Sequence, residues 1–405
     1  MKYKKNWEET QEKWKNYWQR KNEGRPLMFI VARKPEYDEI AKKAEAELDA
    51  TKADPRKHNW QGFYYDLPEE LMWKDMDDKY LKAEMLVGRY RQFCETHEFM
   101  AESFPNMVVD FGPGSLASYM GSDVGFAEDT QWFEPCYEDI DSWEDVEELT
   151  LSDPLGWYKR HLELLKKCKE LAKGDFYVDI PDLMENIDTL ASLRGTSDLM
   201  CDMAVEPEEV KKKVDEVTKC YYEAMGNMYD ICKEEDGSSA YTVFQIWGPG
   251  KCIKLQCDSS AMISTDMFRE VILDSLKEQA KWGDQVLFHL DGPDMIRHLD
   301  AIMEVEGIDA LQWTSGDYGP DGTCPDWDGI YEKAIKAGKS IWVKVYNGKF
   351  DDWVKNVDRM VKKFGSTRMF LHFPEMSMEE AETIIKYADE HWSNVKGTYL
   401  EELGL

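Results

Sequence analysis

The chain has few basic residues for its size. Fifty lysines and arginines face 81 aspartates and glutamates, which leaves a net charge of −31. A field of that sign repels nucleic acid and anionic membrane surfaces, so neither is an expected partner. The simplest interpretation of the acidic excess is that charged helices keep a large protein in solution.

Signals for a membrane or for export are also missing. No apolar run reaches the length of a transmembrane helix. Residues 1–8 are basic but lead into a charged helix without the apolar core of a signal peptide. A cytoplasmic location is therefore expected.

Two further patterns are absent. The nine cysteines are scattered, no two form a CxxC pair, and their odd number argues against a complete disulfide framework. Most are expected to be small buried residues. No GxGxxG fingerprint follows a predicted strand, which argues against a dinucleotide-binding Rossmann domain.

The chain does contain a regular alternation of strand and helix patterns. Hydrophobic residues make up 42% of it, enough for a globular core. From residue 240 onward the alternation is uninterrupted, which predicts parallel strands joined by helical crossovers. Roughly eight strands over the whole chain predict an α/β fold, a (β/α)8 TIM barrel. They are expected at 25–31, 106–110, 176–180, 242–246, 285–288, 308–312, 340–345 and 368–373.

The N-terminal segment predicts an additional element. Trp7, Trp14 and Trp18 recur at helical spacing, so residues 1–23 are expected to form an amphipathic helix that packs against the body. The expected organisation is a helical extension over 1–23 followed by one barrel domain over 24–405.

The polar end of one predicted strand is the most informative site signal. The buried run 285–288 leads into His289 and Asp291, and the next predicted strand ends in Gln312 and Trp313. Side chains two apart on a strand point to the same face, so His289 and Asp291 can converge on one ion or substrate. Active sites of α/β barrels are built at these strand ends.

Several segments, taken in their order along the chain, carry a family resemblance. They are Arg25–Met28, Val109–Asp110 with Gly121, Leu190–Gly195, Gln256–Ser259 with Met267–Phe268, His289–Gly292 and Leu371–Glu375. Together they resemble the uroporphyrinogen decarboxylase superfamily. That superfamily includes the decarboxylase itself and zinc-dependent methyltransferases acting on corrinoid proteins or coenzyme M. The resemblance implies a barrel enzyme.

Two departures argue against decarboxylation of uroporphyrinogen itself. That carboxylate-rich substrate needs a basic cleft. The family's first catalytic arginine, however, aligns with Val31 and its catalytic tyrosine with Ala191. The family's aspartate is retained as Asp110, which the resemblance makes an orienting or acid–base carboxylate across the mouth of the barrel.

The methyltransferase branch binds Zn²⁺ through a histidine, a nearby cysteine and a distant cysteine. By resemblance His289 is that histidine, Asp291 replaces the first cysteine, and His372 or Glu375 lies near the second. Carboxylates and imidazole remain good Zn²⁺ ligands and also suit harder metals. Fewer thiolates leave the zinc a stronger Lewis acid, which favours an oxygen substrate over a thiol.

The resemblance therefore implies a metal-dependent methyltransferase. It would move a methyl group from a small methoxy or methylamine compound to a corrinoid protein that docks over the strand ends. Zn²⁺ is the expected metal, and Asp110, His289 and Asp291 are the expected catalytic residues. The expected substrate-binding residues are Trp247, Asp258, Gln312, Trp313 and Tyr318.

Other interpretations stay open at this point. Asp291 is a favoured helix N-cap residue, Asp258 can stabilise a local turn, and each aromatic residue can be core. A metal-free decarboxylase or lyase would use His289 and Asp291 as a proton-transfer pair. A non-catalytic small-molecule-binding barrel would hold the same two residues in structural hydrogen bonds.

Overall fold

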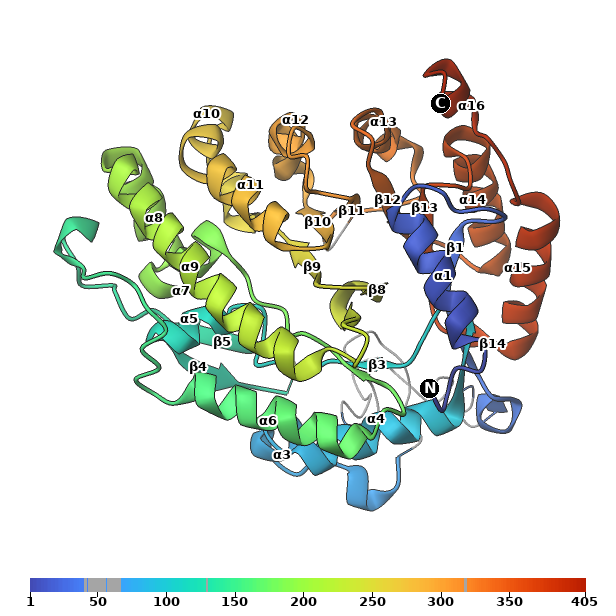
Figure 1. The fold of residues 1–405 in the computed structure, drawn as a ribbon, viewed down its shortest axis with the longest axis horizontal. Helices are drawn as coiled ribbons and strands as arrows, with labels where there is room; N and C mark the ends of the chain where they lie inside the picture. The colour runs from blue at the N-terminus through green and yellow to red at the C-terminus, as the bar shows by residue number, and fades with distance from the viewer. Residues whose placement is uncertain (40–41, 43–55, 57–66, 129, 317–318) are drawn as a thin grey trace.

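The computed structural model describes residues 1–39, 42, 56, 67–128, 130–316 and 319–405 (Figure 1). The chain is a mixed α/β protein with a central, mostly parallel sheet, whose strands run in the order β14-β1-β13-β12-β11-β10-β9. Strand β2 lies antiparallel beside β1. The strands of this sheet are β1 (Leu27–Arg33), β2 (His97–Ala101), β9 (Cys252–Leu255), β10 (Gln285–Asp291), β11 (Ala310–Thr314), β12 (Ser340–Lys344), β13 (Met369–His372) and β14 (Met376–Ser377).

Helices lie around the outside of the sheet, as Figure 1 shows. Helices α11, α12, α13 and α14 each connect one parallel strand to the next between β9 and β13, which confirms the predicted alternation in this half. The longer helices are α1 (Trp7–Trp18), α4 (Ala83–Thr96), α6 (Trp157–Ala172), α7 (Asn186–Arg194), α8 (Thr196–Val205), α9 (Pro207–Cys232), α11 (Leu273–Trp282), α13 (Asp328–Lys336), α14 (Phe350–Phe364) and α15 (Met378–His391). The shorter ones are α3 (Met76–Tyr80), α5 (Ser115–Met120), α10 (Thr265–Met267), α12 (Leu299–Met303) and α16 (Thr398–Glu402).

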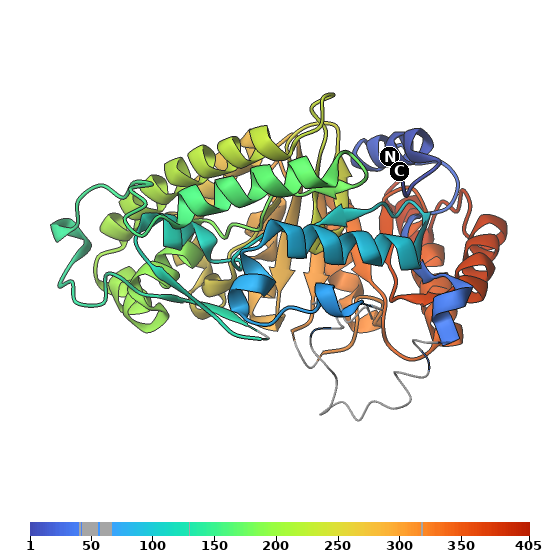
Figure 2. The ribbon, with the colours of Figure 1, turned by 90° about the horizontal axis from the view of Figure 1, so that it is seen from below.

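Helix α9 illustrates how the local sequence sets these elements. It begins with Pro207, whose missing N–H costs nothing at a first helical position. Glu208 and Glu209 follow in its first turn, where negative charge is favourable. Helices α4, α6 and α9 pack side by side (Figure 2). Among the described residues, no helix combines the length and the apolar composition that crossing a membrane requires.

The N-terminal half carries shorter strands. Strands β3 (Asn106–Met107) and β6 (Tyr177–Val178) pair in parallel, and β4 (Asp123–Phe126) with β5 (Gln131–Glu134) forms an antiparallel hairpin. Over the described ranges these short ladders do not join the main sheet into a continuous ring. The arrangement is compatible with a TIM-barrel-like fold without showing a closed barrel.

One predicted strand is wrong. Residues 242–246 were expected to continue the parallel pattern, but the chain reverses there. Strand β7 (Ser239–Tyr241) and strand β8 (Ile246–Gly248) form an antiparallel hairpin through a 3-10 turn. Gln245 adopts φ +53°, a left-handed conformation that an uninterrupted strand does not allow.

Helix α1 lies across the amino ends of the strands. The Trp14 ring packs on Phe370, at the start of β13, with ring centroids 4.9 Å apart. The Tyr17 hydroxyl donates to the backbone oxygen of Ile341, at the start of β12, over 3.2 Å. Both aromatic side chains are fully buried, so the expected amphipathic helix is present and covers this end of the sheet.

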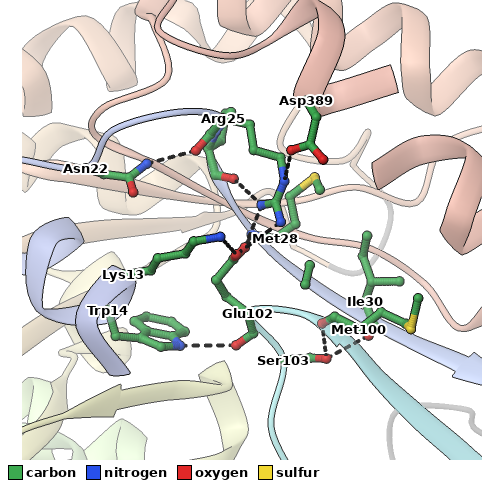
Figure 3. Close-up of polar contacts among 12 residues, drawn as sticks. Lys13, Trp14, Asn22, Arg25, Met28, Ile30, Met100, Glu102, Ser103 and Asp389 are labelled. Carbon is green, nitrogen blue, oxygen red and sulfur yellow. Dashed lines mark hydrogen bonds and ion pairs between the residues drawn. The ribbon is translucent and has the colours of Figure 1, made fainter. Parts of the chain in front are cut away.

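A buried ion pair fixes the segment that follows α1 (Figure 3). Glu102 accepts from Nη1 of Arg25 over 2.7 Å and from the backbone N–H of Met28 over 2.9 Å. Lys13 from α1 reaches the same carboxylate at 2.9 Å, and Asp389 of α15 contacts Nε of Arg25 at 3.1 Å. One buried carboxylate therefore ties α1, β1 and, through Arg25, α15 together.

Candidate metal site at the carboxyl ends of the strands

The register of the parallel strands places alternate side chains in layers on the inner face of the sheet. His289 pairs with Gln312 on β11, and Gln312 pairs with Trp342 on β12. One step toward the carboxyl end, Asp291 pairs with Thr314. His289 and Asp291 therefore share a face, as the strand period requires.

Three ligand-type side chains meet at this end of β9 and β10. One ligand atom from each of Asp258, His289 and Asp291 lies within 4.8 Å of the others, and this is the only such group in the described part of the chain. Nε2 of His289 is 4.0 Å from Oδ2 of Asp291. Oδ1 of Asp258 and Oδ1 of Asp291 are buried and have no hydrogen-bond partner among the described residues.

Gln312 decides which nitrogen of His289 is available. The Gln312 amide nitrogen donates to the backbone oxygen of Trp313 over 2.9 Å and to the Thr314 hydroxyl over 2.8 Å. Its amide oxygen therefore faces Nδ1 of His289, which must be the protonated nitrogen. The lone pair of Nε2 is left for a ligand, as in metal-binding histidines whose other nitrogen is held by a neighbouring acceptor.

A second glutamine orients Asp258 in the same way. The ammonium of Lys254 donates to the amide oxygen of Gln256, so the amide nitrogen donates to Oδ2 of Asp258 over 2.9 Å. Asp188 fixes the backbone at this point by accepting from the N–H groups of Asp258 and Ser259 over 2.9 Å and 2.7 Å. Because Oδ2 is occupied, Oδ1 is the oxygen of Asp258 that is available to the cluster.

The electrostatics of the site show an excess of negative charge. Burial, and then the nearby Asp188 carboxylate, raise the pKa of Asp258 to about 8, although Lys254 opposes the shift. Burial also raises the pKa of Glu185 well above its usual range. Lys254 itself is buried and paired with Asp182 at 2.8 Å. An added cation would favour the ionised form of these carboxyl groups.

The donor set fits a small divalent cation. Burial, and then the Lys254 charge, lower the pKa of His289, which keeps the imidazole in the neutral form that binds metals. Zinc lies about 2.1 Å from nitrogen and oxygen ligands, so two ligands of one ion can be up to about 4.2 Å apart. Three protein ligands with a remaining open position are typical of catalytic zinc sites.

Asp110 lies outside this group of three. It follows β3, and one of its oxygens accepts from the N–H of Gly112 over 3.2 Å. Burial, and then the Asp182 carboxylate, raise its pKa to about 6. Asp110 and Asp182 are therefore close enough to repel each other electrostatically.

His372 and Glu375 are not brought to the cluster. His372 is on the inner face but is stacked between the rings of Phe29, at 5.2 Å, and Trp342, at 5.4 Å. Glu375 contacts Nε of Arg33 at 3.1 Å. His372 ends β13 and Glu375 follows it closely, but β13 lies three positions away from β10 in the sheet.

Trp247 is a correction to the expected pocket. It is fully buried, its indole N–H donates to the Tyr177 hydroxyl over 2.8 Å, and its backbone oxygen accepts from the indole of Trp18 over 2.7 Å. The reversal at residues 242–246 places this ring under α1, at the amino ends of the strands, and away from the cluster.

Trp313 is a second correction. It pairs with Leu290, one residue out of phase with His289, and therefore faces the helices. Its ring packs on Trp327, just before α13, with centroids 5.1 Å apart. Tyr318, also expected to bind substrate, lies outside the described residues.

A cavity of about 390 Å³ adjoins the cluster. Asp258 borders both, so a molecule in the cavity would lie next to this member of the cluster. The other wall residues come from β5 and the residues after it, the segment between β6 and α7, helix α7, the start of α8 and the turn after β9: Phe133, Pro135, Met184, Asp188, Ala191, Ser192, Gly195, Thr196 and Ser259.

Several residues of the site were missed in the sequence. Asp182, Glu185 and Asp188 follow β6 at three-residue spacing, and Lys254 and Gln256 lie on and just after β9. Polar residues at the end of a predicted strand were the available signal for the first group, as they were for His289. The roles of Lys254 and Gln256 depend on contacts between distant segments.

Comparison with known proteins supports the fold. No protein-family model and no curated protein sequence matches the chain. Among solved structures, the chain is similar to a methyltransferase from Methanosarcina mazei, with a TM-score of 0.52 and 12% sequence identity. The match covers 77% of this chain and 87% of that protein. At this identity the likeness concerns the fold alone.

Proposed function

We propose that the protein is a metal-dependent methyltransferase of the uroporphyrinogen decarboxylase superfamily. It would move a methyl group from a small methylated compound to a corrinoid protein in the cytoplasm. The observation that carries the proposal is the convergence of Asp258, His289 and Asp291. Two of these residues have a buried oxygen without a hydrogen-bond partner among the described residues. The fold shared with a methyltransferase from Methanosarcina mazei is consistent with it.

In this proposal Asp258 replaces His372 and Glu375 as the third ligand. A divalent cation, Zn²⁺ by the family resemblance, would supply Lewis acidity toward the heteroatom that carries the methyl group. Gln312 holds the imidazole of His289 in one tautomer. Asp110, with its pKa raised to about 6, would orient the donor or exchange a proton with it.

The geometry favours this proposal over the two alternatives. Nε2 of His289 and Oδ2 of Asp291 are 4.0 Å apart, beyond the reach of a direct hydrogen bond, which counts against direct proton transfer between them. A purely structural role would satisfy the carboxylates within the protein, but Oδ1 of Asp258 and Oδ1 of Asp291 have no partner in the described ranges.

Metal analysis of the purified protein tests the ligand set. We expect about one divalent ion per chain in the wild type and large losses in the Asp258→Ala, His289→Ala and Asp291→Ala variants. His372→Ala and Glu375→Ala are matched controls and should keep their metal. Equal metal content in all five variants, or none in the wild type, would contradict the proposed site.

Methyl transfer is measured with free cob(I)alamin as acceptor, whose absorbance changes on methylation. The wild type should methylate it from a panel of methoxy and methylamine compounds, and the three ligand variants should not. A metal-loaded protein that releases carbon dioxide from a carboxylated compound instead would replace this reaction with a decarboxylation.

A further inference from the structure

Lys344 lies at the carboxyl end of β12, on the same face of the sheet as the cluster. Gln312 pairs with Trp342, and Lys344 is two residues further along the same strand. Side chains of these two positions therefore share the inner face with His289. Unlike Trp342, Lys344 is exposed at this end.

The ammonium group of Lys344 has no carboxylate partner in the part of the chain that the structure describes. It makes no hydrogen bond or ion pair with any described residue, and its nearest recorded contact is the Tyr346 ring, 5.8 Å away. Partial burial of the ammonium group lowers the pKa of Lys344, and no described carboxylate counteracts this shift. In a chain with 81 acidic residues, a lysine at the site without a counter-charge can accept one from a ligand.

The backbone that carries Lys344 is held in place. Its carbonyl oxygen accepts from the N–H of Gly322 over 3.1 Å. Just beyond it, the Asp321 carboxylate accepts from the N–H groups of Tyr346 and Asn347 over 2.6 Å and 2.7 Å. These hydrogen bonds fix the Cα position from which the Lys344 side chain extends.

A buried imidazole lies beside it in the sheet. His372 pairs with Lys344 in the sheet, its side chain is more than nine-tenths buried, and its Nδ1 has no partner among the described residues. Burial, and then the Lys344 charge, lower the pKa of His372 to about 3, so the ring is neutral. The two residues are neighbours in the sheet, and the ammonium group is close enough for its charge to act on the imidazole.

Aromatic rings connect this place with the cluster. The Phe244 ring lies 5.0 Å from His289 and 6.0 Å from Trp342, and Trp342 lies 5.4 Å from His372. Strands β10 and β12 are two positions apart, which separates them by about 10 Å. These rings thus form a continuous aromatic path between the two places.

We propose that Lys344, with His372 beside it, binds an anionic group of the substrate, a carboxylate at the far end of a flat apolar body from the methyl group. This rests on the proposed function, which places the methyl group at Asp258, His289 and Asp291. The methyl donor is then an acid, and methylated amines without an anionic group are poor donors.

Binding of a defined probe tests the proposal. The titration uses 4-methoxybenzoate and its neutral counterpart 4-methoxybenzyl alcohol, with the full-length protein followed by calorimetry before and after metal removal by chelation. We expect Lys344→Met to weaken binding of the acid about tenfold or more, with the alcohol unaffected. Lys344→Arg keeps the charge and should retain most of the affinity. Lys386→Met, which removes an exposed lysine of α15, is the matched control and should change nothing.

The outcomes separate this proposal from the metal chemistry. Unchanged affinity of Lys344→Met for the acid, no binding of the acid to the wild type, or an equal loss for the alcohol would each overturn it. If the purified wild type contains no metal and still binds the acid in a way that depends on Lys344, the anion site is supported. That result would count only against the metal-dependent methyltransferase. Metal content should be the same in Lys344→Met and the wild type.

Discussion

Nδ1 of His289 faces the amide oxygen of Gln312 on the neighbouring strand, in direct register. The contact exists because both residues occupy inner positions of adjacent parallel strands, and because the other end of the amide is already bonded. It fixes the imidazole so that Nε2 is presented to Asp258 and Asp291.

Removing this contact should weaken metal binding without unfolding the protein. Gln312→Leu is expected to lower the affinity for a divalent cation about 10–100-fold, because the imidazole loses its fixed tautomer and orientation. Competition with a chromogenic chelator measures it. Thr314→Val removes only one of the two acceptors of the amide and should have a much smaller effect. Equal affinities of the wild type and Gln312→Leu would contradict a metal at His289.

The buried ion pair shown in Figure 3 should contribute strongly to the stability of the N-terminal region. Glu102→Gln leaves the guanidinium of Arg25, whose side chain is 9% exposed, without its main counter-charge. The expected loss is about 3 kcal/mol in the free energy of unfolding. Asp389→Asn removes a partner that is 62% exposed and should cost less than about 1 kcal/mol. Chemical denaturation of both variants measures the difference.

His161 should make stability depend on pH. It is fully buried, its Nε2–H donates to the oxygen of Val109 over 2.8 Å, and its Nδ1 accepts from the Tyr119 hydroxyl. Burial lowers its pKa from 6.5 to about 4. Between these values the unfolded chain binds a proton that the folded chain does not, so stability falls as the pH drops through this window.

The size of this effect is about 3 kcal/mol between pH 6.5 and 4. His161→Gln is expected to lose this part of the pH dependence while being less stable at pH 7. Denaturant titrations at half-unit pH intervals compare the two slopes. Parallel slopes would show that His161 has the same pKa in the folded and the unfolded chain, and would contradict the prediction.

Helix α1 should be integral to the fold. Trp14→Ala removes a fully buried ring whose indole N–H donates to the oxygen of Glu102 over 3.2 Å. A cost of about 3–5 kcal/mol is expected. Lys15→Ala, on the same helix, breaks only an exposed pair with Glu12 and should cost less than about 1 kcal/mol. Similar stabilities of the two variants would show that α1 is only loosely attached.

The sequence predicts the second half of the fold better than the first. Uninterrupted alternation after residue 240 specifies parallel strands because each pair needs a helical crossover. It does not show that the chain reverses at residues 242–246. The left-handed residue of this reversal is Gln245, and no glycine marks the position in the sequence. Strands as short as β3 and β6 carry too little periodicity to fix their bounds.

The candidate site follows the same division. His289 and Asp291 are recognisable because they end one strand, two residues apart. Asp258 joins them only through the pairing of β9 with β10, which the sequence does not give. The prediction for Trp313 is wrong because a strand pattern shows that successive side chains alternate between two faces, but not which face is the inner one.

The position of α1 has a consequence for the order of events in the proposed reaction. Since this helix covers the amino ends of the strands, both reactants would have to use the opposite end as a shared entrance. A bulky corrinoid protein seated there would block a small molecule from passing. In that reaction the small methyl donor would arrive first, and the corrinoid protein would then close the entrance and would have to leave before the next cycle.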